Sequence, residues 1–139
     1  MSDKTIILIG YSGHGLVAAD TALENKFRIV GYCEREEKIY NPLNLLYLGN
    51  EGDLGFHGWE MDSDYLIGIG DNYIRENIFN LVSIKRKKII SLINSSASVS
   101  QIADLGIGIF VNRKVAINAL VKIGNNVLLN TGCIIEHEC

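Results

Sequence analysis

A histidine between two glutamates, Glu136-His137-Glu138, is the group in this chain best suited to acid–base chemistry. A carboxylate beside an imidazole orients the ring and stabilises its protonated form. This suits a general base that takes a proton from an amine or a hydroxyl. A corner of the chain can follow Ile135, so the sequence leaves open which acid reaches His137. It also leaves open a plain alternative, in which the three residues are a solvated surface feature.

Two glycine-containing segments could hold a phosphate, because each follows a predicted buried strand. The first glycine loop, residues 10–15, reads Gly-Tyr-Ser-Gly-His-Gly, and the second glycine loop, residues 68–72, reads Gly-Ile-Gly-Asp-Asn. Glycines allow a ligand to approach the backbone closely, and a helix after the first loop offers free N–H groups to a phosphate. Both loops are expected at the carboxyl edge of a parallel sheet, where open sheets bind ligands.

The order of glycines in the first loop argues against a dinucleotide. It is G-x-x-G-x-G, whereas the dinucleotide fingerprint is G-x-G-x-x-G, and a simple strand-to-helix turn is the alternative interpretation. A mononucleotide or a nucleotide sugar fits a unit of this size more easily. Glu34 nevertheless stands at the end of the second strand, where an acid that binds ribose is expected. His14 is either a loop residue beside the phosphate or a surface histidine.

The elements that must position these groups form a small α/β unit. Apolar runs bounded by glycines and polar residues predict buried parallel strands over residues 5–10, 28–33, 64–70 and 88–93. Helices are predicted between them over residues 16–23 and 73–82, with Asn72 as the cap of the second. Residues 36–60 are expected to form a loop with one short helix. This order predicts a Rossmann-like, doubly wound parallel sheet.

Beyond this unit, apolar residues recur every six positions. One register is Leu105, Val111, Ile117, Ile123, Leu129 and Ile135; a second is Val115, Val121, Val127, Cys133 and Cys139. Neither a helix nor a simple strand has this period, which is typical of a parallel β-helix with inward-facing aliphatic residues. The second register predicts that Cys133 and Cys139 are small buried apolar residues. Turn-forming residues 94–98 place the junction near residue 94, with domains 1–94 and 95–139.

Composition excludes several classes of function. A net charge of −3 provides no basic stripe, so nucleic acid is not expected as a partner. No apolar stretch is long enough to span a membrane and the first residues do not resemble a signal peptide, so we expect a cytoplasmic protein without membrane insertion. Three scattered cysteines predict neither a disulfide framework nor a metal site.

Three segments in this order, residues 10–15, 69–75 and 127–139, resemble sugar acetyltransferases of the sialic-acid O-acetyltransferase and bacillosamine (UDP-4-amino-sugar) N-acetyltransferase group. The resemblance implies a left-handed β-helix and a homotrimer that binds acetyl-CoA at the seam between neighbouring subunits. It makes His137 the general base and Glu138 its partner, with Asn130 near the reacting amine. The nucleotide-sugar pocket would be lined by Gly10, Ser12, Gly13, His14, Gly15, Gly70, Asp71 and Asn72. Glu34 departs from the aspartate that relatives carry near this strand end.

The leading prediction is therefore acetyl transfer from acetyl-CoA to the amine of a nucleotide-linked sugar in surface glycan synthesis. The family's β-helix runs on beyond the histidine, so we expect this chain to hold about two turns and to lack most of the coenzyme pocket. O-acetylation of a sialic acid, a nucleotide-sugar-binding module without catalysis, and a small nicotinamide enzyme are the alternatives. The sequence Glu-His-Glu-Cys at residues 136–139 favours the amino-sugar branch.

Overall fold

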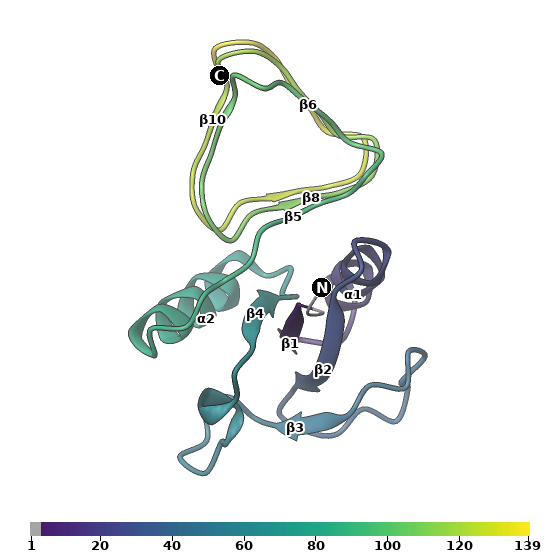
Figure 1. Cartoon of the computed structure of the whole chain (residues 1–139), viewed down its shortest axis with the longest axis vertical. Helices are drawn as coiled ribbons and strands as arrows, with labels where there is room; N and C mark the ends of the chain where they lie inside the picture. Colours follow the sequence, from purple (N-terminus) through teal and green to yellow (C-terminus); the bar gives the residue numbers. More distant parts are fainter. Residues whose placement is uncertain (1–3) are drawn as a thin grey trace. The chain divides into compact units, whose positions relative to one another are not determined.

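A computed structural model describes residues 4–139 of the chain. The chain divides into two compact units, residues 1–89 (unit 1) and residues 90–139 (unit 2). Unit 1 is a parallel sheet with helices, and unit 2 is a triangular coil of short strands (Figure 1). No helix within residues 4–139 combines the length and the apolar character needed to cross a membrane. The fold class predicted from the sequence is confirmed.

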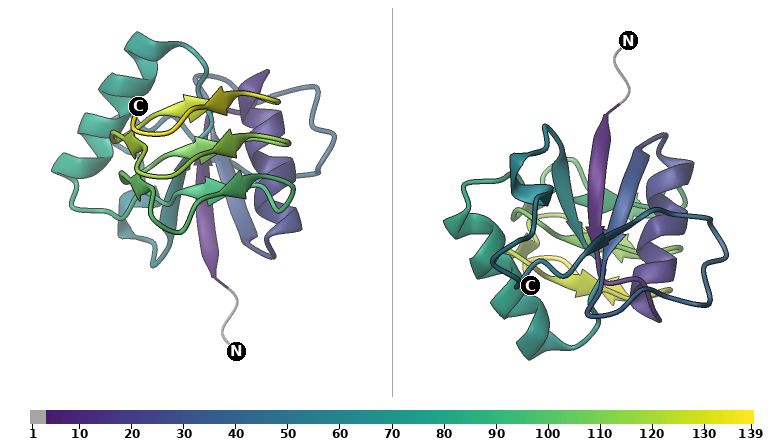
Figure 2. Two further views of the ribbon diagram at one scale, coloured as in Figure 1. Left: turned by 90° about the horizontal axis from the view of Figure 1, so that it is seen from above. Right: turned by 90° about the horizontal axis from the view of Figure 1, so that it is seen from below.

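The sheet of unit 1 has the strand order β3-β2-β1-β4, with every pair parallel. Its strands are β1 (Thr5–Ile9), β2 (Arg28–Cys33), β3 (Tyr47–Gly49) and β4 (Asp64–Ile67). The helices are α1 (His14–Glu24), α2 (Asn72–Ile84) and the short 3-10 helix η1 (Gly58–Glu60). The helices α1 and α2 flank the sheet on opposite sides (Figure 2), as right-handed crossovers that leave β1 and β4 in opposite directions require.

The apolar run of β1 reflects burial on both faces of the sheet. Residues Ile6 to Ile9 are at most 1% exposed. Alternate side chains of a strand point to opposite faces, so Ile7 and Ile9 share one core. That core contains Tyr65, Val82 and other apolar residues. A strand covered on both faces is apolar throughout, which is why the sequence showed it clearly.

Two predictions for unit 1 are corrected. The segment 36–60 has the expected short helix, η1, but it also contains the strand β3, which is only three residues long and lies in a stretch of mixed polarity. The predicted strand 88–93 does not exist as one strand. Ile89 forms a single parallel bridge with Tyr65 in unit 1, whereas β5 (Leu92–Ile93) pairs with a strand of unit 2. The apolar run looked continuous because it passes from one core directly into another.

The cap of α2 is Asp71, not Asn72. Asp71 has extended backbone angles, and its Oδ1 accepts a hydrogen bond of 2.8 Å from the Ile74 N–H. Asn72 is already the first helical residue, and its Oδ1 accepts a hydrogen bond of 2.8 Å from Arg75 Nη2. Both residue types are good caps, so the sequence alone did not distinguish neighbours.

Replacing Asp71 by alanine is expected to lower the free energy of unfolding of unit 1 by about 1 kcal/mol, because the Ile74 N–H loses its acceptor. The measurement is urea unfolding followed by fluorescence of Trp59, the only tryptophan of the chain. Asp71→Asn retains a capping oxygen and should stay close to the wild type. If both variants lose the same free energy of unfolding, the stabilisation comes from the charge of Asp71 and not from the hydrogen bond.

Unit 2 is a β-helix with three strand positions in each coil. Residues paired between coils are 18 apart, as in Leu92 with Phe110 and Phe110 with Leu128. The three sheets have the orders β11-β8-β5, β12-β9-β6 and β10-β7, and the coils stack with their strands parallel (Figures 1 and 2). The other strands are β6 (Ser98–Val99), β7 (Asp104–Leu105), β8 (Phe110–Val111), β9 (Ala116–Ile117), β10 (Lys122–Ile123), β11 (Leu128–Leu129) and β12 (Ile134–Ile135).

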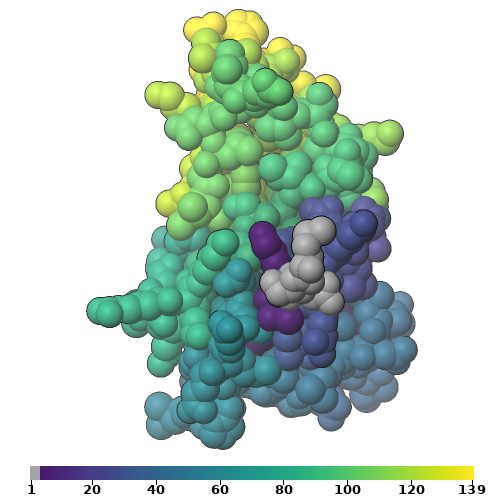
Figure 3. Space-filling view, in the orientation of Figure 1, coloured from purple at the N-terminus to yellow at the C-terminus, as the bar shows by residue number. Residues whose placement is uncertain are grey.

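The two predicted hexad registers form the interior of this coil. Both begin earlier than the sequence analysis placed them, because Ala97 and Val99 also pack against the core that contains Val111 and Val121. Side chains fill the interior of the triangle seen in the same orientation (Figure 3). The prediction for Cys139 is wrong. Cys139 is exposed, whereas Cys133 is partly buried.

The corners of the coil repeat one backbone conformation. A positive φ occurs every six residues, at positions 108, 114, 120, 126, 132 and 138. Glycine and asparagine tolerate this left-handed conformation, but Leu120 and Glu138 adopt it as well. The repeated coil thus imposes the corner geometry, and it places Glu138 at the same corner as His137.

Candidate functional site

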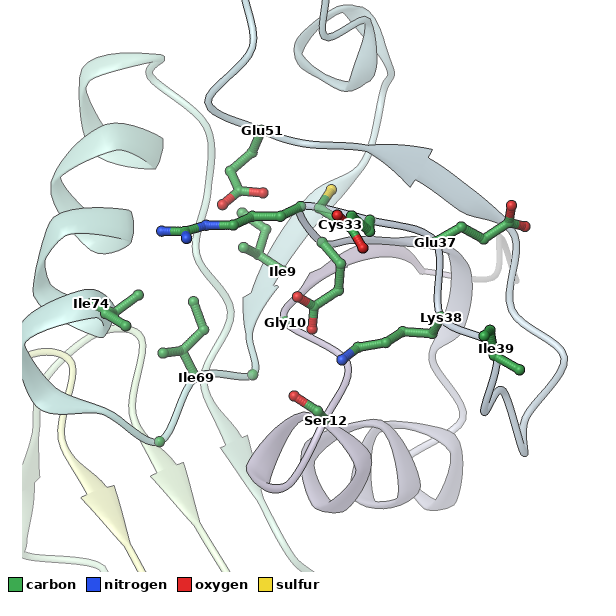
Figure 4. A pocket seen from close by; sticks show the side chains of 15 residues that line it. Ile9, Gly10, Ser12, Cys33, Glu37, Lys38, Ile39, Glu51, Ile69 and Ile74 are labelled. Carbon is green, nitrogen blue, oxygen red and sulfur yellow. The ribbon is translucent and has the colours of Figure 1, made fainter.

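Unit 1 contains a cavity of about 700 Å³ at the carboxyl edge of its sheet (Figure 4). Both glycine loops contribute to its wall, together with the segment that follows β2 and the start of α2. The lining residues include Gly10, Ser12, Cys33, residues 34–39, Glu51, residues 68–70 and Ile74. A cavity of this volume has the size of typical small-molecule sites.

Three glycines let the two loops contact one another through their backbones. A Cβ on Gly15 would collide with the carbonyl oxygen of Gly10. A Cβ on Gly68 would lie 2.6 Å from the same oxygen and 2.8 Å from the Cα of Gly15. The first turn of α1 therefore packs directly against both strand ends.

His14 is the first residue of α1, and it is half-buried. Burial, and secondly the positive charge of Arg75, lower the pKa of His14 to about 4. The imidazole is therefore neutral near pH 7 and supplies no positive charge to a phosphate. His14 is half-buried and is not among the residues that line the cavity, so a role in binding the phosphate stays a prediction.

Arg75 holds the second glycine loop in place. From the first turn of α2, its Nη1 donates to the carbonyl oxygens of Gly70 at 3.0 Å and Ile69 at 3.3 Å. Arg75 belongs to the second of the three segments that resemble the acetyltransferases, but the sequence alone predicted no role for it. Its position could have indicated this role. An arginine one turn into a helix that follows a glycine loop can reach the carbonyl groups of that loop with its donors.

Glu34 joins the end of β2 to the first glycine loop. One of its carboxylate oxygens, Oε1, accepts a hydrogen bond of 2.6 Å from the Tyr11 N–H. The carboxylate also lines the cavity, so its remaining acceptor positions can bind a hydroxyl group. The neighbouring Cys33 is chemically inert near neutral pH, because burial raises the pKa of its thiol.

The charged side chains that line the cavity are mostly acidic. Glu34, Glu36, Glu37 and Glu51 stand against two cations, Arg35 and Lys38. Burial raises the pKa of Glu51, and the negative charge of Glu34 raises it further, whereas Arg35 acts in the opposite direction. A phosphate that enters this cavity therefore depends on few positive charges and on backbone N–H groups.

Three tyrosines, whose rings contact one another at a tilt, hold the segment that follows β2, residues 34–45. The rings of Tyr11 and Tyr32 are 4.7 Å apart, and those of Tyr32 and Tyr47 are 5.4 Å apart. Each hydroxyl is bonded to this segment. Tyr11 donates to Asn41 Oδ1 at 2.8 Å, Tyr47 donates to the Glu34 carbonyl at 3.0 Å, and Tyr32 accepts from the Lys38 N–H at 2.8 Å. The segment is therefore fixed over the cavity, although the sequence suggested only a loop.

The second group of candidate residues lies at a corner of unit 2. His137 Nδ1 is 3.1 Å from Glu138 Oε1, and both side chains are about 70% exposed (71% and 70%). Of the two flanking acids, Glu138 is thus the one in contact with the imidazole. With a proton on Nδ1 donated to Glu138, Nε2 presents a lone pair to the outside. This arrangement can accept a proton from a bound nucleophile.

Asn130 lies at a different corner of the same coil, after β11, whereas His137 follows β12. It continues a column of asparagines at 18-residue spacing, Asn94, Asn112 and Asn130. The first two are buried, and each donates its backbone N–H to the coil stacked on it. Asn130 is the exposed member of the column. The structure does not bring it into contact with His137.

The residues singled out from the sequence have different places in the structure. Gly10, Ser12, Glu34 and Gly70 line the cavity, whereas Gly13, His14, Gly15, Asp71 and Asn72 shape the loops behind it. Residues 4–139 contain no group of three or more His, Cys, Asp or Glu side chains placed to bind a metal ion. Lys38, Arg35, Glu51 and Arg75 are the residues that sequence reasoning missed.

The chain is similar to known proteins in sequence and in fold. A family model described as the PglD N-terminal domain matches residues 5–82, which is more than half of the chain. The acetyltransferase domain of PglB from Neisseria gonorrhoeae FA1090, in complex with acetyl coenzyme A, is 25% identical with a TM-score of 0.86. The similarity covers 99% of this chain and 67% of that one.

PerB from Caulobacter crescentus, in complex with CoA and GDP-perosamine, is also 25% identical with a TM-score of 0.86, over 99% of this chain and 65% of its own. A mutant of the perosamine N-acetyltransferase from that organism, 24% identical with a TM-score of 0.86, shares the fold over the same proportions. The chain spans about two thirds of the length of these proteins. The family match and the similar structures together show that the chain belongs to the PglD-type family of sugar N-acetyltransferases.

Proposed function

We propose that this protein transfers an acetyl group from acetyl-CoA to the amine of a nucleotide-linked amino sugar, as a step of surface glycan biosynthesis. In this proposal, domain 1–94 holds the nucleotide sugar and domain 95–139 presents the general base. The observation that carries the proposal is the contact between His137 and Glu138 at an exposed corner of a hexad coil. The cavity of unit 1 supports it, because its volume and glycine loops suit a nucleotide.

The chemistry follows from the tautomer that Glu138 favours. The amine nitrogen attacks the thioester carbonyl while His137 Nε2 takes a proton from that nitrogen. Glu138 stabilises the imidazolium that forms. The sequence resemblance, and no contact with His137 in this structure, is what assigns Asn130 to the neighbourhood of the reacting amine. A C–N bond forms, the C–S bond breaks, and the thiolate of coenzyme A leaves and takes up a proton.

The proposal also concerns which nucleotide carries the sugar. The sequence resemblance favours a UDP-linked 4-amino sugar, whereas the similar structure of PerB contains GDP-perosamine. Glu34 would accept a ribose hydroxyl with the carboxylate oxygen that Tyr11 does not use. Calorimetry with UDP and with GDP would separate the two nucleotides.

We further propose a homotrimer in the cytoplasm that binds acetyl-CoA between neighbouring subunits. Several large apolar side chains of unit 2 face outward. They support such an assembly, because contact with another subunit would remove their apolar surface from water. They are Ile102, Ile107, Leu120 and Ile134, between 57% and 63% exposed. Light scattering that finds only monomers would contradict this part.

Acetyl transfer is tested by following the thiol that coenzyme A releases. We expect release with a UDP- or GDP-linked 4-amino sugar and none with a sialic acid, which offers a hydroxyl group. Release with the sialic acid alone would favour O-acetylation. Binding of a nucleotide sugar without binding of acetyl-CoA, and without thiol release, would instead indicate a module without catalysis.

A further inference from the structure

The charge of the cavity lining has the same sign as the charge of the proposed substrate. A nucleotide sugar carries negative charge on both phosphates, and four glutamates line the cavity that would receive it. Among the lining residues, Arg35 and Lys38 are the cations. Arg35 is exposed, whereas Lys38 is half-buried. Lys38 is therefore the cation better placed to meet a phosphate inside the cavity.

Lys38 is held so that its side chain enters the cavity. Its backbone N–H donates to the hydroxyl of Tyr32, a ring with no exposed surface, at 2.8 Å. Lys38 is half-buried, although Glu36, Glu37 and Ile39 around it are exposed. Figure 4 shows its ammonium reaching toward Ser12 and the first glycine loop. Within residues 4–139, its ammonium forms no salt bridge with a carboxylate.

The place that Lys38 reaches is where a phosphate would be expected. The first glycine loop, whose Gly10 and Ser12 line the cavity, leads into the eleven-residue helix α1. The N-terminus of a helix attracts anions through its unpaired N–H groups and its dipole. His14 at this helix end is neutral near pH 7. A lysine from the opposite wall therefore supplies the positive charge that the helix end lacks.

We propose that Lys38 is a phosphate-binding residue of the substrate site. Its ammonium donates to the diphosphate of the nucleotide sugar over the first glycine loop, and it does not contact the base. The inference rests on the proposed function, because it assumes that the cavity holds a nucleoside diphosphate. Tyr32 helps to position Lys38, because its hydroxyl accepts the hydrogen bond that fixes the Lys38 backbone.

The experiment compares nucleotides with nucleosides. Dissociation constants of UDP, GDP, uridine and guanosine are measured by calorimetry for the wild type, Lys38→Gln, Lys38→Arg and Lys88→Gln. Lys38→Gln should raise the dissociation constant of the preferred nucleoside diphosphate by about tenfold or more, as expected for loss of a hydrogen bond between charged groups. The dissociation constant of the matching nucleoside should stay unchanged. Lys38→Arg should restore most of the affinity.

Lys88→Gln is the matched control, because it removes the same charge at the opposite end of the sheet, where the Lys88 carbonyl accepts from Tyr65 at the start of β4. It should bind both diphosphates like the wild type. If the wild type binds neither UDP nor GDP, the proposed function fails. If the wild type binds one of them, the proposed function stands. The assignment of Lys38 is then wrong if Lys38→Gln binds that diphosphate as tightly as the wild type, or if its affinity for the nucleoside falls as much as its affinity for the diphosphate.

Discussion

Replacing His137 by alanine is expected to lower the turnover of acetyl transfer by about 10²- to 10⁴-fold, the usual contribution of a general base. The reason is that the imidazole Nε2 is the only atom in the proposed mechanism that takes the amine proton. The affinity for the nucleotide sugar should stay unchanged, since the cavity is built from unit 1 alone. Thiol release at saturating substrate measures the turnover.

The chain provides a matched control for this variant in His57. Its Nδ1 lies 3.9 Å from Glu60 Oε2, and both side chains are more than 80% exposed (87% and 81%). His57 is thus another exposed histidine beside a glutamate, but it belongs to unit 1 and does not line the cavity. His57→Ala should leave turnover unchanged. Equal turnover in His137→Ala and the wild type would remove His137 from the mechanism.

Replacing Gly15 by alanine is expected to destabilise unit 1 by about 2 kcal/mol or more, because the added methyl collides with the Gly10 carbonyl. The sign of the effect is diagnostic. Within a helix, alanine is ordinarily about 1 kcal/mol more favourable than glycine, so a loss of stability reports the collision and not helix propensity. Urea unfolding followed by Trp59 fluorescence measures it, since Trp59 packs against the core of unit 1.

Gly70 serves as the control at the same edge of the sheet. A Cβ there would lie 3.5 Å from the His14 Cβ, which is an ordinary contact. Gly70→Ala should therefore change the free energy of unfolding far less than Gly15→Ala. If Gly15→Ala unfolds at the same urea concentration as the wild type, the two strand ends do not pack as closely as described.

The β-helix could be predicted from the sequence because its signal repeats. Each coil buries equivalent positions, so Val111, Ile117 and Leu129 report the same environment at six-residue steps. The strand β3 carried no such signal. It is three residues long, and its pairing with β2 depends on a segment that is distant in the sequence. Short strands of mixed polarity are decided by their partners and not by their own residues.

The cap of α2 and the division of the run 88–93 show the same limit. Asp71 and Asn72 are both capping residues, and only the backbone angles distinguish them. Ile89 and Leu92 are both buried, but in different units. Local sequence indicates that a residue is buried or caps a helix, whereas the partner it meets depends on distant parts of the chain.

The sequence by itself determined the two kinds of unit, the hexad interior, the glycine loops and the pairing of an imidazole with an adjacent acid. These features are written in neighbouring residues or in a repeat, so no long-range contact is needed to find them. The tertiary structure decided that Glu138 contacts His137, that His14 is neutral, and that Lys38 and Glu51 share a cavity with the first glycine loop. The contact of Glu138 with His137 depends on the corner conformation that the coil imposes. The other two outcomes depend on burial and on charges from segments far apart in the chain, which meet only when the backbone brings them together.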